Sequence, residues 1–111
     1  MITTARARTI AMTLPEVTEQ DHHGFPSYRV RGKIFATAPD DAHLNVMIEP
    51  DEIRAVAAET PGGCEELWWG KRLAAVRVTL EAVDERLLGA LLTDAWRRKA
   101  PATLRRSIDR P

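Results

Sequence analysis

The chain has 111 residues, and its 16 Lys and Arg residues are balanced by 16 Asp and Glu residues, so its formal net charge is zero. This length fits a single domain over residues 1–111, and a composition of 44% hydrophobic and 29% charged residues excludes a disordered chain. Neutrality excludes the simplest case for nucleic-acid binding, which is a uniformly basic domain.

The sequence indicates a cytoplasmic protein that carries no membrane segment. No apolar run approaches the roughly 18 residues that a membrane-spanning helix needs. Arg6 and Arg8 interrupt the N-terminal segment, which argues against a secretory signal. Because Cys64 is the only cysteine, no disulfide can form within the chain, as is usual for proteins of the reducing cytosol.

The first predicted element is a helix over residues 5–14. Apolar residues recur at positions i, i+3, i+4 and i+7 from Ala7 to Leu14, which is the spacing of one buried helix face. Pro15 then ends the helix, because a proline removes a backbone donor and fixes its own backbone angle.

The segment after this helix is typical of four antiparallel strands. Residues 27–30 and 43–48 alternate polar and apolar side chains, as half-buried strands do. Arg31-Gly32 predicts a two-residue turn into a strand over residues 33–37. Turns this short cannot return a chain in parallel, so we expect an antiparallel meander.

A second helix and a second hairpin follow. The helix is expected to begin at Glu49-Pro50, since proline suits the first helical position, and to end at Thr60. Residues 67–69 and 75–80 are predicted as two strands on either side of the tip Gly70-Lys71-Arg72.

A third helix is predicted from Asp84, which caps its first turn, to about Lys99. Pro101 breaks it, because the residue before a proline is pushed out of the helical region. A helical turn through Leu104 and a frayed tail over residues 105–111 are expected to follow. The order α-β-β-β-β-α-β-β-α predicts an α+β fold, an antiparallel sheet with helices packed on one face.

The sequence carries no recognisable catalytic or metal-binding motif, and we expect no catalytic residue, no cofactor and no bound metal. His22, His23, His43 and Cys64 are the only strong transition-metal ligands besides carboxylates. On a strand, His22 and His23 would point to opposite faces, which makes a shared zinc site hard to build. A nucleophilic Cys64 would need a nearby histidine base, and the spacing of the histidines in the sequence does not indicate one. Cys64 is therefore interpreted as a partly buried thiol. The protein is therefore predicted not to be an enzyme.

Trp68 and Trp69 are adjacent on a predicted strand, so their rings should lie on opposite faces of the sheet. We expect one ring in the core and the other on a partly covered sheet face. At most one of them is then available as a platform on which nucleobases stack.

The neutral total hides an uneven distribution of charge. Residues 1–60 have a net charge of −3 and residues 61–111 a net charge of +3. Basic residues gather at the two hairpin tips and near the C-terminus, and such clusters can hold phosphates. They also serve solubility at turns and complement the helix dipole at a helix end. The candidate DNA-binding residues are Arg29, Arg31, Lys33, Lys71, Arg72, Arg97, Arg98, Lys99 and Arg105.

One stretch of the sequence resembles a known family. Residues 22–36, with the sequence HHGFPSYRVRGKIFA, closely resemble the MmcQ/YjbR family of small bacterial proteins. Supporting pieces, in chain order, are LPEVTE at residues 14–19, WGKR at 69–72, AWR at 95–97, Ala100-Pro101 and Leu104. Many relatives have a tryptophan at the start of the strand after the second hairpin. Here Leu73-Ala74-Ala75 stands at that place, which puts any ligand contact made by that aromatic in doubt.

The resemblance implies a CyaY-like, frataxin-like fold and a DNA-binding function in which the two hairpins act as a double wing. It also raises iron binding, which in frataxin uses an acidic first helix. This chain has Arg6 and Arg8 there and no acidic residue before Pro15, which disfavours iron. The alternative function is an interaction domain whose open sheet face takes a protein or small-molecule partner. The sequence predicts no oligomeric state.

Overall fold

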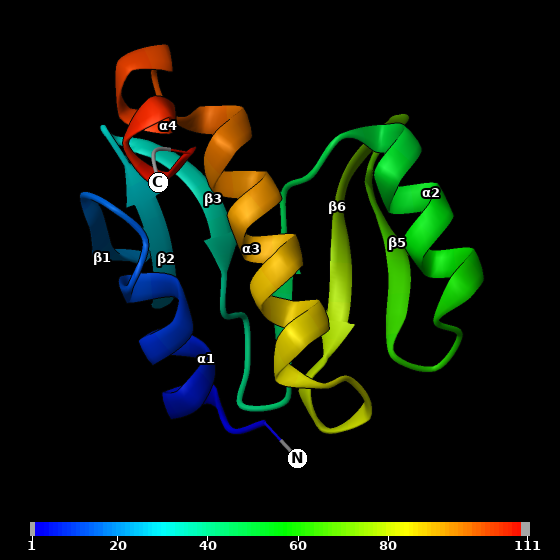
Figure 1. Cartoon of the computed structure of the whole chain (residues 1–111). Helices are drawn as coiled ribbons and strands as arrows, with labels where there is room; N and C mark the ends of the chain where they lie inside the picture. The colour runs from blue at the N-terminus through cyan, green and yellow to red at the C-terminus, as the bar shows by residue number, and fades with distance from the viewer. Residues whose placement is uncertain (1, 110–111) are drawn as a thin grey trace.

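The chain forms a six-stranded antiparallel sheet with helices over one face, in a computed structural model that describes residues 2–109 (Figure 1). The strand order is β1-β2-β3-β4-β6-β5. In chain order the elements are α1 (Thr4–Met12), β1 (Val17–His22), β2 (Phe25–Val30), β3 (Lys33–Thr37), β4 (His43–Val46), α2 (Pro50–Glu59), β5 (Cys64–Trp69), β6 (Arg72–Thr79), the short 3₁₀ helix η1 (Leu80–Ala82), α3 (Glu85–Lys99) and α4 (Ala102–Asp109). The predicted α+β class is confirmed, with α4 as an added helix.

The helices begin and end at residues that the sequence marks for these roles. The hydroxyl oxygen of Thr3 accepts a hydrogen bond from the Arg6 amide at 3.0 Å and caps α1. The carboxylate of Asp84 accepts one from the Leu87 amide at 2.8 Å and caps α3. Before Pro101, Ala100 adopts an extended backbone, and this ends α3.

The core lies between the sheet and the helices. Leu88, Leu92 and Trp96 on α3 are fully buried against sheet residues such as Phe35. The Trp96 indole N–H donates a hydrogen bond to the carbonyl oxygen of Pro15 at 3.0 Å. A buried indole needs such a partner, and this one joins α3 to the chain that leaves α1.

The sheet divides at one end because β4 is short. β3 pairs with β4 through only two residue pairs, Ala36 with Val46 and Thr37 with Asn45. Beyond them the β2–β3 hairpin and the β5–β6 hairpin continue without a strand between them. Both hairpin tips and the C-terminal end of α3 lie at this end of the molecule, the upper end in Figure 1.

The C-terminal segment differs from the prediction. A frayed tail was expected over residues 105–111, but residues 102–109 form α4, so the prediction is wrong for residues 105–109. The helix is held because Leu104 is buried and Ile108 packs on the core. In addition, a guanidinium N–H of Arg97 donates to the Asp109 carboxylate at 2.9 Å. Residues 110 and 111 lie outside the described part of the chain.

Candidate functional site

The two hairpin tips are tight turns that expose basic side chains. In the β2–β3 turn, Arg31 and Gly32 both have positive φ, 51° and 80°, as a type I′ turn requires. In the β5–β6 turn, Gly70 has φ 63°, a value that glycine adopts readily. The turn pairs Trp69 directly with Arg72. This pairing is why β6 begins at Arg72, three residues earlier than predicted.

A cavity of about 590 Å³ lies between these hairpins, on the sheet face away from the helices. Its cationic lining comes from three elements: Arg29 on β2, Lys33 on β3 and Lys99 at the end of α3. Lys99 reaches this face because the sheet is divided at the end where α3 finishes. No Asp or Glu belongs to the lining.

The rest of the lining is apolar, aromatic or uncharged. Ile34 and Met47 supply apolar surface, and Trp69 supplies an indole ring. The remaining members are His22, Phe25, Gly32, Thr37 and Asn45. Sequence reasoning did not single out this set. The alternating pattern of β4 predicts two of its members. Asn45 and Met47 alternate with the core-facing Leu44 and Val46, so their side chains should lie on the open face.

Positive charge is concentrated around Lys99. Burial lowers the pKa of the Lys99 ammonium, the nearby charges of Arg98, Arg72 and Lys33 lower it further, and the Glu49 carboxylate opposes them in part. A second, adjoining cavity of about 250 Å³ is lined by Arg72, Arg98 and Lys99 together with Met47. Several cations from different elements therefore share one small region, and an anion placed there would relieve their mutual repulsion.

The two neighbouring tryptophans are both exposed, and the expectation that one would lie in the core is wrong. Trp68 is 47% and Trp69 48% exposed. Trp68 pairs with Leu73, whose side chain lies in the core, and its indole N–H donates to Glu66 at 3.0 Å. The ring stays exposed although α2 packs against β5. Trp69 lines the cavity, with the Arg72 guanidinium 5.1 Å from its ring centroid.

Four of the nine predicted basic residues pair with a carboxylate or donate to a backbone carbonyl within residues 2–109, and a fifth, Arg29, donates only to the Ser27 hydroxyl oxygen, at 3.1 Å. Arg31 forms a two-pronged ion pair with Glu16 at 2.6 and 2.9 Å. Arg98 pairs with Glu49 at 3.0 Å and also donates to two backbone carbonyls. Arg97 on α3 pairs with Asp109 on α4, and Arg105 on α4 donates to the carbonyl oxygen of Arg97, so both side chains are engaged between α3 and α4.

The other five predicted residues form no ion pair with a carboxylate in the described part of the chain. They are Arg29, Lys33, Lys71, Arg72 and Lys99. All five lie on the two hairpins or at the end of α3. Arg29, Lys33 and Lys99 line the cavity, Arg72 lines the adjoining one, and Lys71 belongs to the β5–β6 turn. We call these five residues the hairpin cluster.

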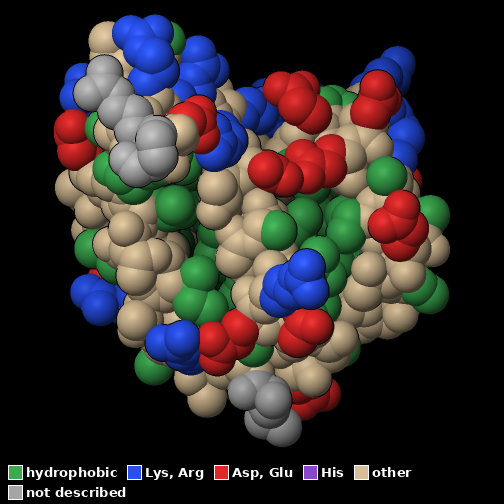
Figure 2. Space-filling model, viewed as in Figure 1, with side chains coloured by type: hydrophobic (Ala, Val, Ile, Leu, Met, Phe, Trp, Pro, Cys, Tyr) green, Lys and Arg blue, Asp and Glu red, His purple; other side chains and the backbone are tan. Residues whose placement is uncertain are grey.

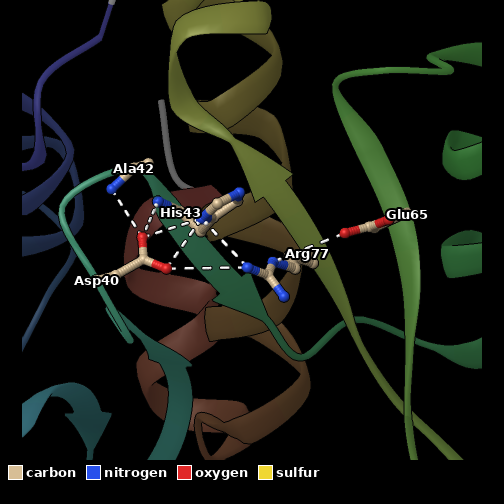
Figure 3. Close-up of polar contacts among 5 residues, drawn as sticks. All are labelled: Asp40, Ala42, His43, Glu65 and Arg77. Carbon is tan, nitrogen blue, oxygen red and sulfur yellow. Dashed lines mark hydrogen bonds and ion pairs between the residues drawn. The ribbon is translucent and has the colours of Figure 1, made fainter.

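The opposite half of the open face carries a network of charged and polar groups of both signs (Figure 3). The Asp40 carboxylate accepts hydrogen bonds from the Ala42 and His43 amides at 2.8 and 2.9 Å and lies 2.9 Å from the His43 ring. Arg77 lies between Asp40 and Glu65, at 3.8 and 3.7 Å. Both carboxylates lie near the Arg77 guanidinium, although its Nε atom has no hydrogen-bond partner within residues 2–109. The cations of this face that form no ion pair with a carboxylate within residues 2–109 lie at the hairpin end.

His22 and His23 lie together at the β1–β2 turn, whereas Cys64 is buried at the start of β5. His22 ends β1 while His23, with φ 54°, belongs to the turn, and their rings lie 4.4 Å apart, not on opposite faces as predicted. Within residues 2–109, no group of three or more His, Cys, Asp or Glu residues could hold a metal ion. Cys64 is buried, and burial raises the pKa of its thiol, which disfavours the nucleophilic thiolate.

Comparison with known proteins identifies the family. The sequence model of the YjbR family matches residues 12–98. The chain belongs to the YjbR family. This YjbR-family chain is also similar to the crystal structure of a Deinococcus radiodurans protein with a DUF419 domain. The TM-score is 0.77 at 20% sequence identity, over 100% of this chain and 91% of that one, and this likeness shows the fold alone. No protein of curated function matches the chain in sequence.

The matched region of this YjbR-family chain contains both hairpins and ends within the last turn of α3. It therefore includes all of the hairpin cluster except Lys99, the residue after its end. None of the helices within residues 2–109 has the length and apolar character needed to span a bilayer.

Proposed function

We propose that this YjbR-family protein binds DNA through its two hairpins, which contact the phosphate backbone, and that it does so in the cytoplasm without catalysing a reaction. The observation that carries the proposal is the hairpin cluster. Four of its five cations, from β2, β3, β6 and α3, line two adjoining cavities at the hairpin end of the molecule, Lys71 lies on the β5–β6 turn, and no carboxylate lines either cavity.

The two faces of the molecule differ in a way that favours this arrangement. Acidic side chains gather over α2 and the neighbouring part of α3 in Figure 2. There burial raises the pKa of Glu52, and the neighbouring Asp94 and Glu49 raise it further. This acidic surface repels phosphate, so DNA should approach from the open face, where the hairpin cluster lies.

Zero net charge is compatible with such binding. Affinity for DNA comes largely from the cations that touch phosphates and from the counterions that they release. Distant acidic charges contribute less, because salt screens them over about 8 Å at physiological ionic strength. A handful of contacts then gives modest affinity that falls steeply as salt is added.

The alternative is a protein or small-molecule partner on the same open face. The half-exposed Trp69 and the apolar side chains of Ile34 and Met47 favour it, since an apolar surface does not contribute to binding a phosphate. The two functions differ in their response to salt. An apolar partner would bind nearly independently of ionic strength, whereas DNA would not.

The test is fluorescence anisotropy of a labelled DNA duplex titrated with protein at several salt concentrations. The affinity should fall with a log–log slope near −0.9 for each phosphate contact. Lys71→Glu should lower the affinity about tenfold and reduce the slope by about 1.

The matched control is Arg86→Glu. Arg86 is also exposed and forms no ion pair within residues 2–109, but it lies in the first turn of α3, about 20 Å from Lys99 along the helix. It should bind like the wild type. Absence of binding at about 50 mM salt, or equal losses in Lys71→Glu and Arg86→Glu, would contradict the proposal.

A further inference from the structure

The cavity between the hairpins has properties that contact with a duplex backbone does not require. It combines an apolar floor, formed by Ile34 and Met47, and the indole ring of Trp69 with three cations. We infer that it binds unpaired nucleotides of a single-stranded nucleic acid, with a base stacked on Trp69 and the adjoining phosphates held by Lys33 and Lys99. This inference rests on the proposed function and names its substrate class.

The size of the cavity fits an unpaired nucleotide. Its volume of about 590 Å³ is in the range of pockets that enclose small molecules. In a duplex the bases stay inside the stack and present only their edges, so a duplex can meet the cations at the rim but cannot fill the floor. A single strand has bases that can turn away from the backbone and enter.

Trp69 is placed to stack against a base. Its indole is 48% exposed and lines the cavity, and the Arg72 guanidinium lies 5.1 Å from the ring centroid. Every base has a π face, so stacking on an exposed indole does not depend on nucleotide sequence, and arginine adds a cation–π contribution. Arg72 belongs to the hairpin cluster, so one hairpin supplies both the aromatic ring and a cation.

The floor offers a hydrogen-bond acceptor that lacks a donor. Asn45 lines the cavity, and its Oδ1 atom has no hydrogen-bond partner within residues 2–109. A buried acceptor without a donor is costly. Nε of Arg77, which pairs with Asn45 across β4 and β6, is likewise buried without a partner within residues 2–109. Because the Asn45 Oδ1 atom is covered, a base could donate to it only after the Asn45 side chain turned toward the cavity.

The cations lie around this floor, where they can contact the phosphates of the nucleic-acid strand whose base enters the cavity. Lys33 begins β3 and Lys99 ends α3, and both line the cavity together with Arg29. The mutual repulsion of these charges contributes to the lowered pKa of Lys99. A phosphate between Lys33 and Lys99 would relieve it and leave the base directed toward the apolar floor.

The experiment compares three labelled probes of about twelve nucleotides, a length within known single-strand site sizes: a base-bearing DNA strand, the same strand with abasic sites, and the duplex. The base-bearing strand should bind about tenfold more tightly than the other two. An RNA strand of the same sequence separates the two kinds of nucleic acid, and tighter binding of either strand than of the duplex supports the inference.

Variants of the two adjacent tryptophans assign the stacking ring. Trp69→Ala should lower the affinity for the base-bearing strand about tenfold and leave duplex binding unchanged. Trp69→Phe should keep most of the affinity. Trp68→Ala is the matched control, because Trp68 is equally exposed but pairs with the core-facing Leu73, and it should bind like the wild type.

The failures of the two proposals are distinguishable. If abasic and base-bearing strands bind equally and Trp69→Ala has no effect, the inference is overturned while salt-dependent DNA binding stands. If no nucleic acid binds at about 50 mM salt, a level that favours phosphate contacts, both proposals are overturned.

Discussion

Lys33, at the start of β3, and Lys99, at the end of α3, line the same cavity, and neither forms an ion pair with a carboxylate within residues 2–109. Two like charges brought together without a counterion reduce the stability of the folded chain. Such an arrangement is typical of a binding site, where the missing counter-charge is supplied by the ligand.

This relationship predicts opposite effects of one substitution on stability and on binding. Lys99→Met keeps the aliphatic stem and removes the charge. It should leave the free energy of unfolding unchanged or raise it by roughly 0.5 kcal/mol, since the site is partly in water and its repulsion is screened. Nucleic-acid affinity should fall about tenfold, with the salt slope reduced by about 1. Urea denaturation and anisotropy check the two effects, and a parallel loss of both would indicate a structural role instead.

A second prediction concerns the pH dependence of stability. Burial, a shared hydrogen bond with Asp94, and the charges of Asp94 and Glu49 raise the pKa of Glu52 to about 7. The folded chain thus holds this proton more tightly than the unfolded chain. The resulting stabilisation is complete below a pH of 4.5, the ordinary value, and is lost as the pH rises through about 7.

Glu52→Gln isolates this contribution, because glutamine has no proton to lose in this range. Solvent screening limits the contribution to about 1 kcal/mol. Relative to the variant, the wild type should lose about that much unfolding free energy between about pH 5 and about pH 8. Urea denaturation at both pH values measures it. A difference between wild type and variant that does not change with pH would contradict the prediction.

The hydrogen bond from Trp96 to Pro15 should be important for stability. Trp96→Phe removes the indole N–H, leaves the Pro15 carbonyl oxygen without this partner and creates a small cavity in the core. The expected loss is about 2–3 kcal/mol of unfolding free energy. Urea denaturation should show a lower midpoint with an unchanged slope. A loss below about 0.5 kcal/mol, within the range of surface substitutions, would contradict this role.

The ion pair between Arg97 and Asp109 should hold the end of α4 locally. Asp109→Asn should change the global unfolding free energy by less than about 0.5 kcal/mol, because the pair is solvent-exposed. Amide hydrogen exchange within residues 102–109 should become faster while exchange in β3 and α3 is unchanged. Exchange that is unaltered throughout α4 would mean that the packing of Leu104 and Ile108 is sufficient.

Much of the fold was predictable because local signals agree with it. Asp84 and Pro101 bound α3, and Arg31-Gly32 forms the expected turn. The extent of α4 was not predictable in this way. The short segment is stabilised by the contacts of Leu104 and Ile108 with a distant core, and nothing in the local pattern reveals these contacts.

The candidate site was predictable only in part. Lys33, Lys71 and Arg72 follow from the hairpin signals, because a two-residue turn places its flanking residues at an exposed tip. The position of Lys99 depends instead on β3 and β4 sharing only two residue pairs, which lets the end of α3 lie between the hairpins. That is a property of the assembled sheet. The exposure of both Trp68 and Trp69 likewise was not visible in the local pattern, which predicts one ring in the core.

The most direct test of the account is a titration of ¹⁵N-labelled protein with an oligonucleotide, followed by amide and indole chemical shifts. The account predicts the largest changes at Gly32, at Gly70 and at the indole N–H of Trp69, with small changes at the indole of Trp68 and throughout α4. Largest changes on α4, or changes spread evenly over the molecule, would contradict binding between the hairpins.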